Sequence, residues 1–220
     1  MLDTVIFDMD GLLIDSEPLW QKAGIETLKE FGINLTVEQY YESTGLRTSE
    51  WIEWWFTRYN IDKEKAKAAI TAIEEKAIEN IRIHGEAYPG TRYILEFFKE
   101  RNFTIGLGTS SPLRLVDVVV EKLGIKEYFT AYSSAEYLTH GKPHPEVFMN
   151  CALELGANPL NCLCFEDSFN GMIAAKAAKM KCVVVPAALQ YEESRWNAAD
   201  LKLRSLKDFN KFLLERMSFN

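Results

Sequence analysis

The stretch VIFDMDGLLIDSE, residues 5–17, decides the fold. In it a short apolar run ends directly before Asp8, and Asp10 and Gly11 follow within three positions. Short apolar runs without polar alternation are typical of strands that are covered on both faces of a parallel sheet. Such sheets bind ligands at the carboxyl ends of their strands. Two carboxylates at that place repel each other and require a cation or a shared proton, although Asp, Asp and Gly also form ordinary turns.

Similar apolar runs recur along the chain, with helical patterns between them. The predicted strands are Thr4–Phe7, 103–107, 131–133 (the weakest), 162–165 and 182–185. The helical patterns begin after Gly90, at Ser111-Pro112 as N-cap and first helical residue, at Pro145 and at Ser168, and the last three end near Gly124, Gly156 and Lys179. This alternation predicts βαβ units and therefore an α/β fold with a Rossmann-like parallel sheet.

One region breaks this rhythm, because it contains helical patterns and no convincing strand. The predicted helices lie near 17–31, 37–43, 48–59 and 62–83. The last of them places six small or apolar residues on one face, namely Ala66, Ala69, Ile70, Ile73, Ala77 and Ile81. We therefore predict a helical cap domain, residues 15–87, inserted into a core domain of residues 1–14 and 88–220.

Composition excludes several classes of function. The chain has 220 residues, a net charge of −7 and 47% hydrophobic residues, which suits a globular protein and argues against nucleic acid as a partner. Four cysteines without a CxxC pair, and only three histidines, supply a zinc site poorly and suggest reduced core thiols. No signal peptide and no apolar run of about 20 residues is visible. We expect a cytoplasmic monomer with no membrane partner.

A hydroxyl cluster follows the predicted strand 103–107. Thr109, Ser110 and Ser111 stand just before a helix begins, and backbone N–H groups and hydroxyls at such a place bind anions. Gly106 and Gly108 also form half of a dinucleotide fingerprint, so an NAD-dependent oxidoreductase is one alternative. The third glycine of that fingerprint is absent, which disfavours it.

Two further loops carry charged groups. Lys142 lies between Gly141 and Pro143 on a stiff loop, where a compact ammonium suits phosphate, although an ordinary surface lysine is the commoner case. Glu166 and Asp167 follow the strand 162–165. Oxygen ligands without His or Cys favour Mg²⁺ over zinc, but an acidic cap of the next helix would have the same composition.

The order of the motifs DMDG, TSS, GKPHP and EDS resembles the haloacid dehalogenase (HAD) superfamily over nearly the whole chain. It is most similar to the branch that holds β-phosphoglucomutases and sugar-phosphate phosphatases, and in detail to bacterial hexose- and hexitol-phosphate phosphatases such as 2-deoxyglucose-6-phosphatase. The resemblance implies a HAD fold with an inserted cap. It also implies Mg²⁺-dependent hydrolysis of a small phosphorylated metabolite, a hexose or hexitol phosphate.

The resemblance also implies residue roles. Asp8 would attack phosphorus to form an aspartyl-phosphate, and Asp10 would protonate the leaving alcohol and then activate water. Thr109, with the backbone of Ser110, would hold the phosphoryl oxygens, and Lys142 would bridge nucleophile and phosphate.

The metal site that the resemblance implies uses residues from two loops. Asp8, Asp167 and the backbone carbonyl of Asp10 would bind Mg²⁺, with Glu166 supporting them. Ser111 and Asn170 complete the expected phosphate- and substrate-binding residues.

The expected cap contributes substrate contacts. The resemblance places Gly45 and Arg47 over the active site, where a guanidinium can bind sugar hydroxyls or phosphate. Trp20 stands where mutases of this branch carry a histidine, and an indole cannot act as a general base. We expect Trp20 instead to line the substrate pocket, and packing between cap and core is the open alternative. A sugar-phosphate mutase is thus the weaker alternative, and a non-catalytic binding protein is the other. The aromatic run Trp51, Trp54, Trp55 and Phe56 leaves a cap–core contact and a dimer contact open.

Overall fold

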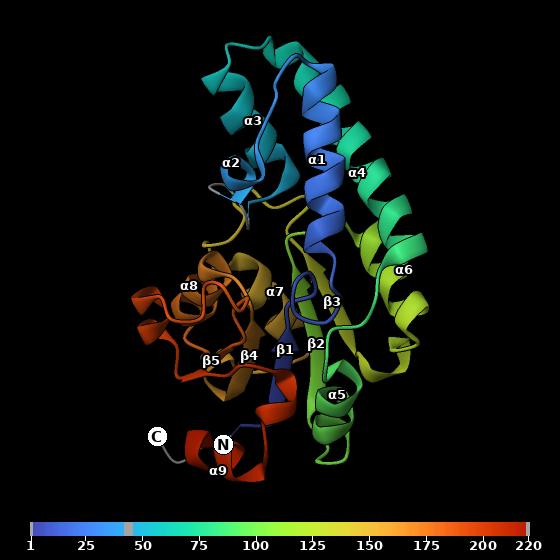
Figure 1. The fold of residues 1–220 in the computed structure, drawn as a ribbon. Helices are drawn as coiled ribbons and strands as arrows, with labels where there is room; N and C mark the ends of the chain where they lie inside the picture. The colour runs from blue at the N-terminus through green and yellow to red at the C-terminus, as the bar shows by residue number, and fades with distance from the viewer. Residues whose placement is uncertain (1, 42–45, 219–220) are drawn as a thin grey trace.

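The computed structural model describes residues 2–41 and 46–218. Its core is a parallel β-sheet with helices packed around it (Figure 1). The described strands form one parallel sheet in the order β3-β2-β1-β4-β5-β6. The strands are β1 (Thr4–Phe7), β2 (Thr104–Thr109), β3 (Ala131–Ser134), β4 (Cys162–Glu166), β5 (Lys181–Val184) and β6 (Leu201–Lys202). The predicted fold class is confirmed, although the two-residue strand β6 was missed and β2 continues two residues beyond its predicted end.

The register brings the functional loops to one edge of the sheet. Phe7 of β1 lies opposite Leu107 of β2 and Phe165 of β4. Because all three strands are parallel, the residues that follow these positions leave the sheet side by side. Asp8, Thr109 and Glu166 therefore start the site at one edge, as expected for an open parallel sheet.

Alternation along the strands separates two apolar cores. Val5 and Phe7 pack on one face of β1, with α5 (Thr91–Lys99), α6 (Leu113–Leu123) and α9 (Lys211–Ser218). Ile6 packs on the other face, with α7 (Glu146–Glu154) and α8 (Phe169–Ala177). A strand that is apolar on both faces needs helices on both sides, which explains why no polar alternation appears in its sequence.

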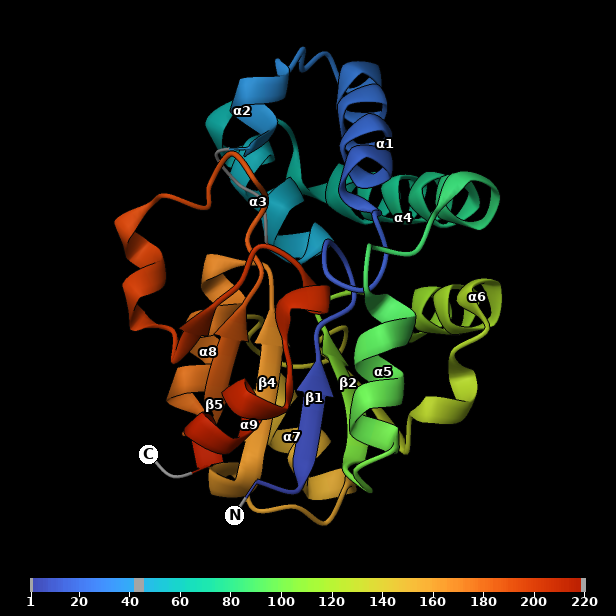
Figure 2. The ribbon, with the colours of Figure 1, turned by 60° about the horizontal axis from the view of Figure 1, so that its bottom comes forward.

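Helices α1–α4 lie together over the carboxyl ends of the strands (Figures 1 and 2). They are α1 (Glu17–Glu30), α2 (Val37–Tyr41), α3 (Thr48–Arg58) and α4 (Ala66–His84). No helix in the described ranges combines the length and apolarity that crossing a bilayer requires. The helical character predicted for this region is confirmed, and its boundaries as a separate domain, 15–87, stay a proposal.

Helices α1–α4, which we call the cap, share an apolar core of their own. Trp51, Trp55 and Phe56 of α3 are buried there against small and apolar residues of α1 and α4, and Trp54 is 37% exposed. Three of the four residues in the aromatic run therefore serve packing inside the cap. The burial of these three side chains therefore fits neither of the two contacts considered from the sequence, a cap–core contact or a dimer contact.

The loop after β2 differs from its prediction. Helix α6 begins at Leu113 with Pro112 at the N-cap position, so Ser111 is not the cap. Gly106 and Gly108 lie inside β2, where side chains would meet the residues of α7: a Cβ at Gly106 would lie 2.7 Å from Cys151 Sγ. These glycines permit close packing of a helix on the strand, and they do not form a dinucleotide-binding turn.

All four cysteines are buried and free, in agreement with the core role expected for them. Cys162, Cys164 and Cys182 lie on β4 and β5, and Cys151 lies on α7. Burial raises the pKa of the Cys162 thiol to about 12, so it stays protonated and unreactive at neutral pH.

Candidate active site

A buried ion network lies at the carboxyl edge of the sheet. The ammonium of Lys142 donates to Asp8 Oδ1 at 2.6 Å, to Glu166 Oε1 at 2.6 Å and to the carbonyl of Gly108 at 3.1 Å. Burial alone would lower the pKa of Lys142, but the two carboxylates hold it above its ordinary value. Lys142 is therefore a permanent positive charge that cannot serve as a base at neutral pH.

Glu166 holds this network in place. Its Oε2 accepts hydrogen bonds from the backbone N–H groups of Asp167 and Ser168, at 3.1 and 3.0 Å, and from the Ser168 hydroxyl at 2.9 Å. Gly171 leaves room for this carboxylate, because a Cβ there would overlap it. With both oxygens hydrogen-bonded, Glu166 is placed to position Lys142.

Three carboxylates lie close enough to share a cation. Oxygens of Asp8, Glu166 and Asp167 lie within 4.8 Å of one another. Burial raises the pKa of Asp8 to about 8, against the attraction of Lys142 and with added repulsion from Glu166. Burial and the neighbouring carboxylates raise the pKa of Asp167 as well. A divalent cation would offset this repulsion and keep the group ionised, so the residues present fit such an ion.

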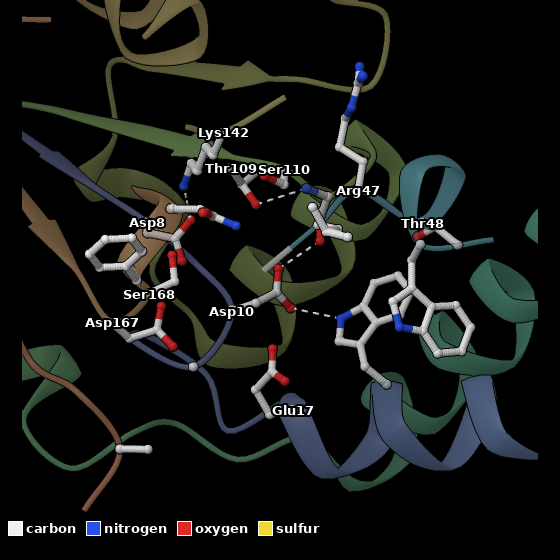
Figure 3. Close-up of a pocket in the computed structure, with 18 of the residues that line it drawn as sticks. Asp8, Asp10, Glu17, Arg47, Thr48, Thr109, Ser110, Lys142, Asp167 and Ser168 are labelled. Carbon is white, nitrogen blue, oxygen red and sulfur yellow. Dashed lines mark hydrogen bonds and ion pairs between the residues drawn. The ribbon is translucent and has the colours of Figure 1, made fainter. Parts of the chain in front are cut away.

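Asp10 lies at the boundary between core and cap, outside the carboxylate cluster. Its Oδ1 accepts from the Ser16 hydroxyl at 2.6 Å and from Trp20 Nε1 at 3.0 Å. Its Oδ2 accepts from the Ser111 hydroxyl at 2.7 Å. The dashed lines at Asp10 in Figure 3 mark the bonds from Trp20 and Ser111. Ser16 precedes α1 but makes no side-chain cap bond to it. Both Ser16 and the indole of Trp20 thus orient Asp10, and sequence reasoning had found neither contact.

The predicted hydroxyl cluster and the carboxylates of Asp8, Asp10 and Asp167 line one cavity of about 540 Å³. Thr109 is buried, and its Oγ1 accepts from the Ser111 backbone N–H at 3.0 Å. The buried Ser110 hydroxyl has no hydrogen-bond partner within the described ranges. Asn170 of α8 also lines the cavity. Unpartnered polar groups beside a cavity are expected where a polar ligand binds.

The guanidinium of Arg47 bonds to protein groups, and its expected contact with substrate stays a prediction. Its Nη1 donates to the carbonyls of Ala135 and Leu138, at 3.1 and 2.6 Å. Its Nη2 donates to Glu50 Oε1 at 2.7 Å and to the carbonyl of Thr139 at 3.3 Å. Although Arg47 lines the cavity, its terminal nitrogens are engaged. The geometry favours a contact between cap and core over the predicted substrate contact.

This contact reaches the loop that carries Lys142. Glu50 Oε1 also accepts from the Gly141 backbone N–H at 3.4 Å. Gly141 has no Cβ, and one built there would lie 2.8 Å from Arg47 Nε. We call these two cap residues and their bonds to the core loop the Arg47–Glu50 clasp. Gly45, the other expected cap residue, lies outside the described residues.

Two carboxylates in the cavity lining, those of Asp15 and Glu17, were not predicted as site residues. Glu17 lines the cavity at the start of α1, and the part of the chain that the structure describes offers it no hydrogen bond or ion pair. Burial, and then the charges of Asp10 and Asp15, raise the pKa of Glu17 to about 7. Glu17 lies within the stretch 5–17 that decides the fold. Its position alone could not mark it as a site residue, because acidic residues are common in the first turn of any helix.

Comparison with known proteins identifies the class. The family model of haloacid dehalogenase-like hydrolases matches residues 2–179. The chain belongs to this family, which confirms the resemblance drawn from its motifs. The solved β-phosphoglucomutase of Clostridium difficile superposes with a TM-score of 0.85 at 25% identity, covering 98% of this chain and 96% of that one.

Curated relatives narrow the class further. Hexitol phosphatase B of Escherichia coli K12 is 38% identical over 92% of this chain and 92% of its own length. A fructose-1-phosphate phosphatase of the same organism is 30% identical, covering 82% of this chain and 95% of its own length. The chain is accordingly an enzyme, a phosphatase of the haloacid dehalogenase-like family.

Proposed function

We propose that the enzyme is a Mg²⁺-dependent phosphatase that hydrolyses a small phosphorylated metabolite, a hexose or hexitol phosphate, through an aspartyl-phosphate on Asp8. The observation that carries this proposal is the position of Asp8. Lys142 holds Oδ1, and Oδ2 has no hydrogen bond among the described residues. Asp8 thus keeps one oxygen for attack beside a polar cavity. The names of the curated relatives support a sugar phosphate as substrate.

The proposed reaction has two steps. In the first, Asp8 Oδ2 forms a bond to phosphorus while the ester P–O bond breaks, and Asp10 gives its proton to the leaving alkoxide. In the second, a water molecule attacks phosphorus, gives a proton back to Asp10 and releases inorganic phosphate from Asp8. The hydrogen bonds from Ser16, Trp20 and Ser111 fix the orientation of the Asp10 carboxyl group, which acts in both steps.

Charge neutralisation is the main requirement of phosphoryl transfer. Lys142 supplies a fixed positive charge to Asp8 and, we propose, to the phosphoryl group, which Thr109 and Ser110 would also contact. Asp8, Asp167 and the backbone carbonyl of Asp10 would hold Mg²⁺, with Glu166 in support. When bound, this ion would supply further positive charge beside the transferred group.

Phosphate release from a panel of hexose, hexitol and triose phosphates, with and without Mg²⁺, tests the proposal. We expect turnover that needs Mg²⁺ and that falls by about 10³-fold or more in Asp8→Asn, because the nucleophile is lost. Asp3→Asn is a matched control, since Asp3 is an exposed residue before β1. Full turnover by Asp8→Asn would exclude the covalent mechanism.

The alternative is transfer of the phosphoryl group within a sugar phosphate, as in a mutase. Trp20 speaks against it, because its indole N–H is already donated to Asp10 and cannot accept a proton. Phosphorus NMR of the products distinguishes the two reactions. Free phosphate is expected, and an isomerised sugar phosphate would support the mutase.

A further inference from the structure

We infer that Glu17 is a specificity-determining residue, which accepts a hydroxyl of a neutral, polyol-type leaving group and disfavours substrates that carry a second anionic group. This inference rests on the proposed phosphatase function and names the chemistry of the leaving group. It concerns the side of the cavity formed by the start of α1, away from the buried ion network. The evidence for this role is the arrangement of charged side chains on that side of the cavity.

Glu17 lies on the leaving-group side of the site. Figure 3 shows its carboxylate directed into the cavity near Asp10 and Asp167. The proposed proton donor to the leaving oxygen is Asp10, so the part of the substrate beyond that oxygen lies near Glu17. The carboxylate has no partner within the described ranges, and its oxygens are therefore free to accept hydroxyl groups.

The lining of the cavity is rich in negative charge. The acidic residues that line it are Asp8, Asp10, Asp15, Glu17 and Asp167. The proposed cation would offset Asp8 and Asp167, but nothing in the described lining neutralises Glu17. Above about pH 7, where Glu17 is ionised, a second phosphate or a carboxylate on the substrate would meet this uncompensated charge. Like charges in a partly desolvated site repel strongly.

Two of the three cations in the described lining are each engaged by several protein groups. Lys142 is engaged by Asp8 and Glu166, and the terminal nitrogens of Arg47 are engaged in the clasp. The remaining cation in the lining, Arg195, pairs with Glu193 through Nε at 2.7 Å. The segment 42–45, which is not described, has the sequence Glu-Ser-Thr-Gly and brings no positive charge.

Two matched substrate pairs test this inference with the intact enzyme. One pair is glucose 6-phosphate and glucose 1,6-bisphosphate, and the other is glycerol 3-phosphate and 3-phosphoglycerate. For each pair the measured quantity is the ratio of kcat/KM for the more anionic substrate to that for its partner. In Glu17→Gln we expect this ratio to rise by about 10-fold, which corresponds to ~1.4 kcal/mol of relieved repulsion.

Glu26→Gln is the matched control, because Glu26 is an exposed residue of the same helix outside the cavity lining. It should leave both ratios within about twofold of wild type. Ratios that are also unchanged in Glu17→Gln, including a uniform loss on all four substrates, would overturn the role of Glu17. Absence of Mg²⁺-dependent turnover by the wild type on every ester would overturn the phosphatase proposal itself, and with it this inference.

Discussion

The two walls of the cavity are built differently. The core wall carries Asp8 and Lys142, which are almost fully buried and form an ion pair, and Lys142 also pairs with the buried Glu166. The cap wall carries Trp20 and Glu17, which are partly exposed. A buried charge network costs desolvation and tolerates no missing partner, whereas a half-exposed wall tolerates change. The comparison suggests that the core fixes the chemistry and the cap adjusts its orientation and substrate range.

The largest effect is expected at the core wall, from Lys142→Met. This change leaves two buried carboxylates without their cation, which typically costs about 3–5 kcal/mol of unfolding free energy. Turnover should fall by about 10³-fold, because the fixed positive charge beside Asp8 is lost. Denaturant unfolding and phosphate release measure the two quantities.

Lys76→Met is the control for this change. Lys76 pairs with Glu30 at the same 2.6 Å, but on the surface of the cap, where such pairs contribute about 1 kcal/mol or less. If both lysine variants lost the same unfolding free energy, the contrast between the two walls would not hold.

The next effect is expected at the Arg47–Glu50 clasp, with Arg47→Ala. The lost bonds to three core carbonyls should lower kcat/KM by about 10-fold for every ester, including p-nitrophenyl phosphate, because the cap is held less firmly. Backbone amides of residues 135–141 should exchange faster with solvent. Arg47→Lys should not restore activity, since an ammonium lacks the planar set of donors.

The same variant separates the clasp from the substrate contact expected from the sequence. A guanidinium that binds the sugar hydroxyls of the substrate would affect sugar phosphates and spare p-nitrophenyl phosphate. Arg58→Ala, at the other end of α3 and over the Trp54 ring, is the control and should leave amide exchange in residues 135–141 unchanged.

A smaller effect is expected from Trp20→Phe, which removes one donor from Asp10 and keeps an aromatic ring. A hydrogen bond to a charged group contributes about 1.5–3 kcal/mol. Because Ser16 and Ser111 still hold the carboxyl, we expect only about a 5-fold fall in kcat with KM nearly constant. A higher KM at unchanged kcat would instead mean that Trp20 contacts the substrate and does not orient Asp10. Trp54→Phe is the exposed control.

The core wall could be predicted from the sequence, and most of the cap wall could not. Asp8, Thr109 and Glu166 each stand at the end of an apolar run, and parallel strands bring such ends together whatever the helices do. Lys142 gave a weaker signal, because a lysine in a loop is more often an ordinary surface residue, and the family resemblance was needed to assign its role. The sequence patterns of helices α1 and α3 were clear, but these patterns do not indicate how the helices lie over the sheet.

The missed contacts depend on that placement. The bond from Trp20 to Asp10 spans the junction of cap and core, and the bonds of Arg47 to the loop 135–139 join residues about 90 positions apart in the chain. Periodicity reports which face of a helix is apolar and not what its polar residues meet. Strand β6 was missed for another reason, since two residues give no pattern.

The smallest effect concerns Glu17 and the stability of the protein in EDTA. The folded state raises the pKa of Glu17 from 4.5 to about 7, so between these values the folded protein holds a proton that the unfolded chain has released. Stability contributed by this group is therefore present below about pH 4.5 and is lost as pH rises to about 7. Glu17→Gln removes the titration, so its Tm should equal that of wild type near pH 4. Near pH 8 it should exceed wild type by about 2–4 °C, the shift that ~1 kcal/mol produces in a chain of this length. Glu26→Gln should show no such difference, and a Tm gap in Glu17→Gln that is independent of pH would mean that the carboxylate is not held in a repulsive site.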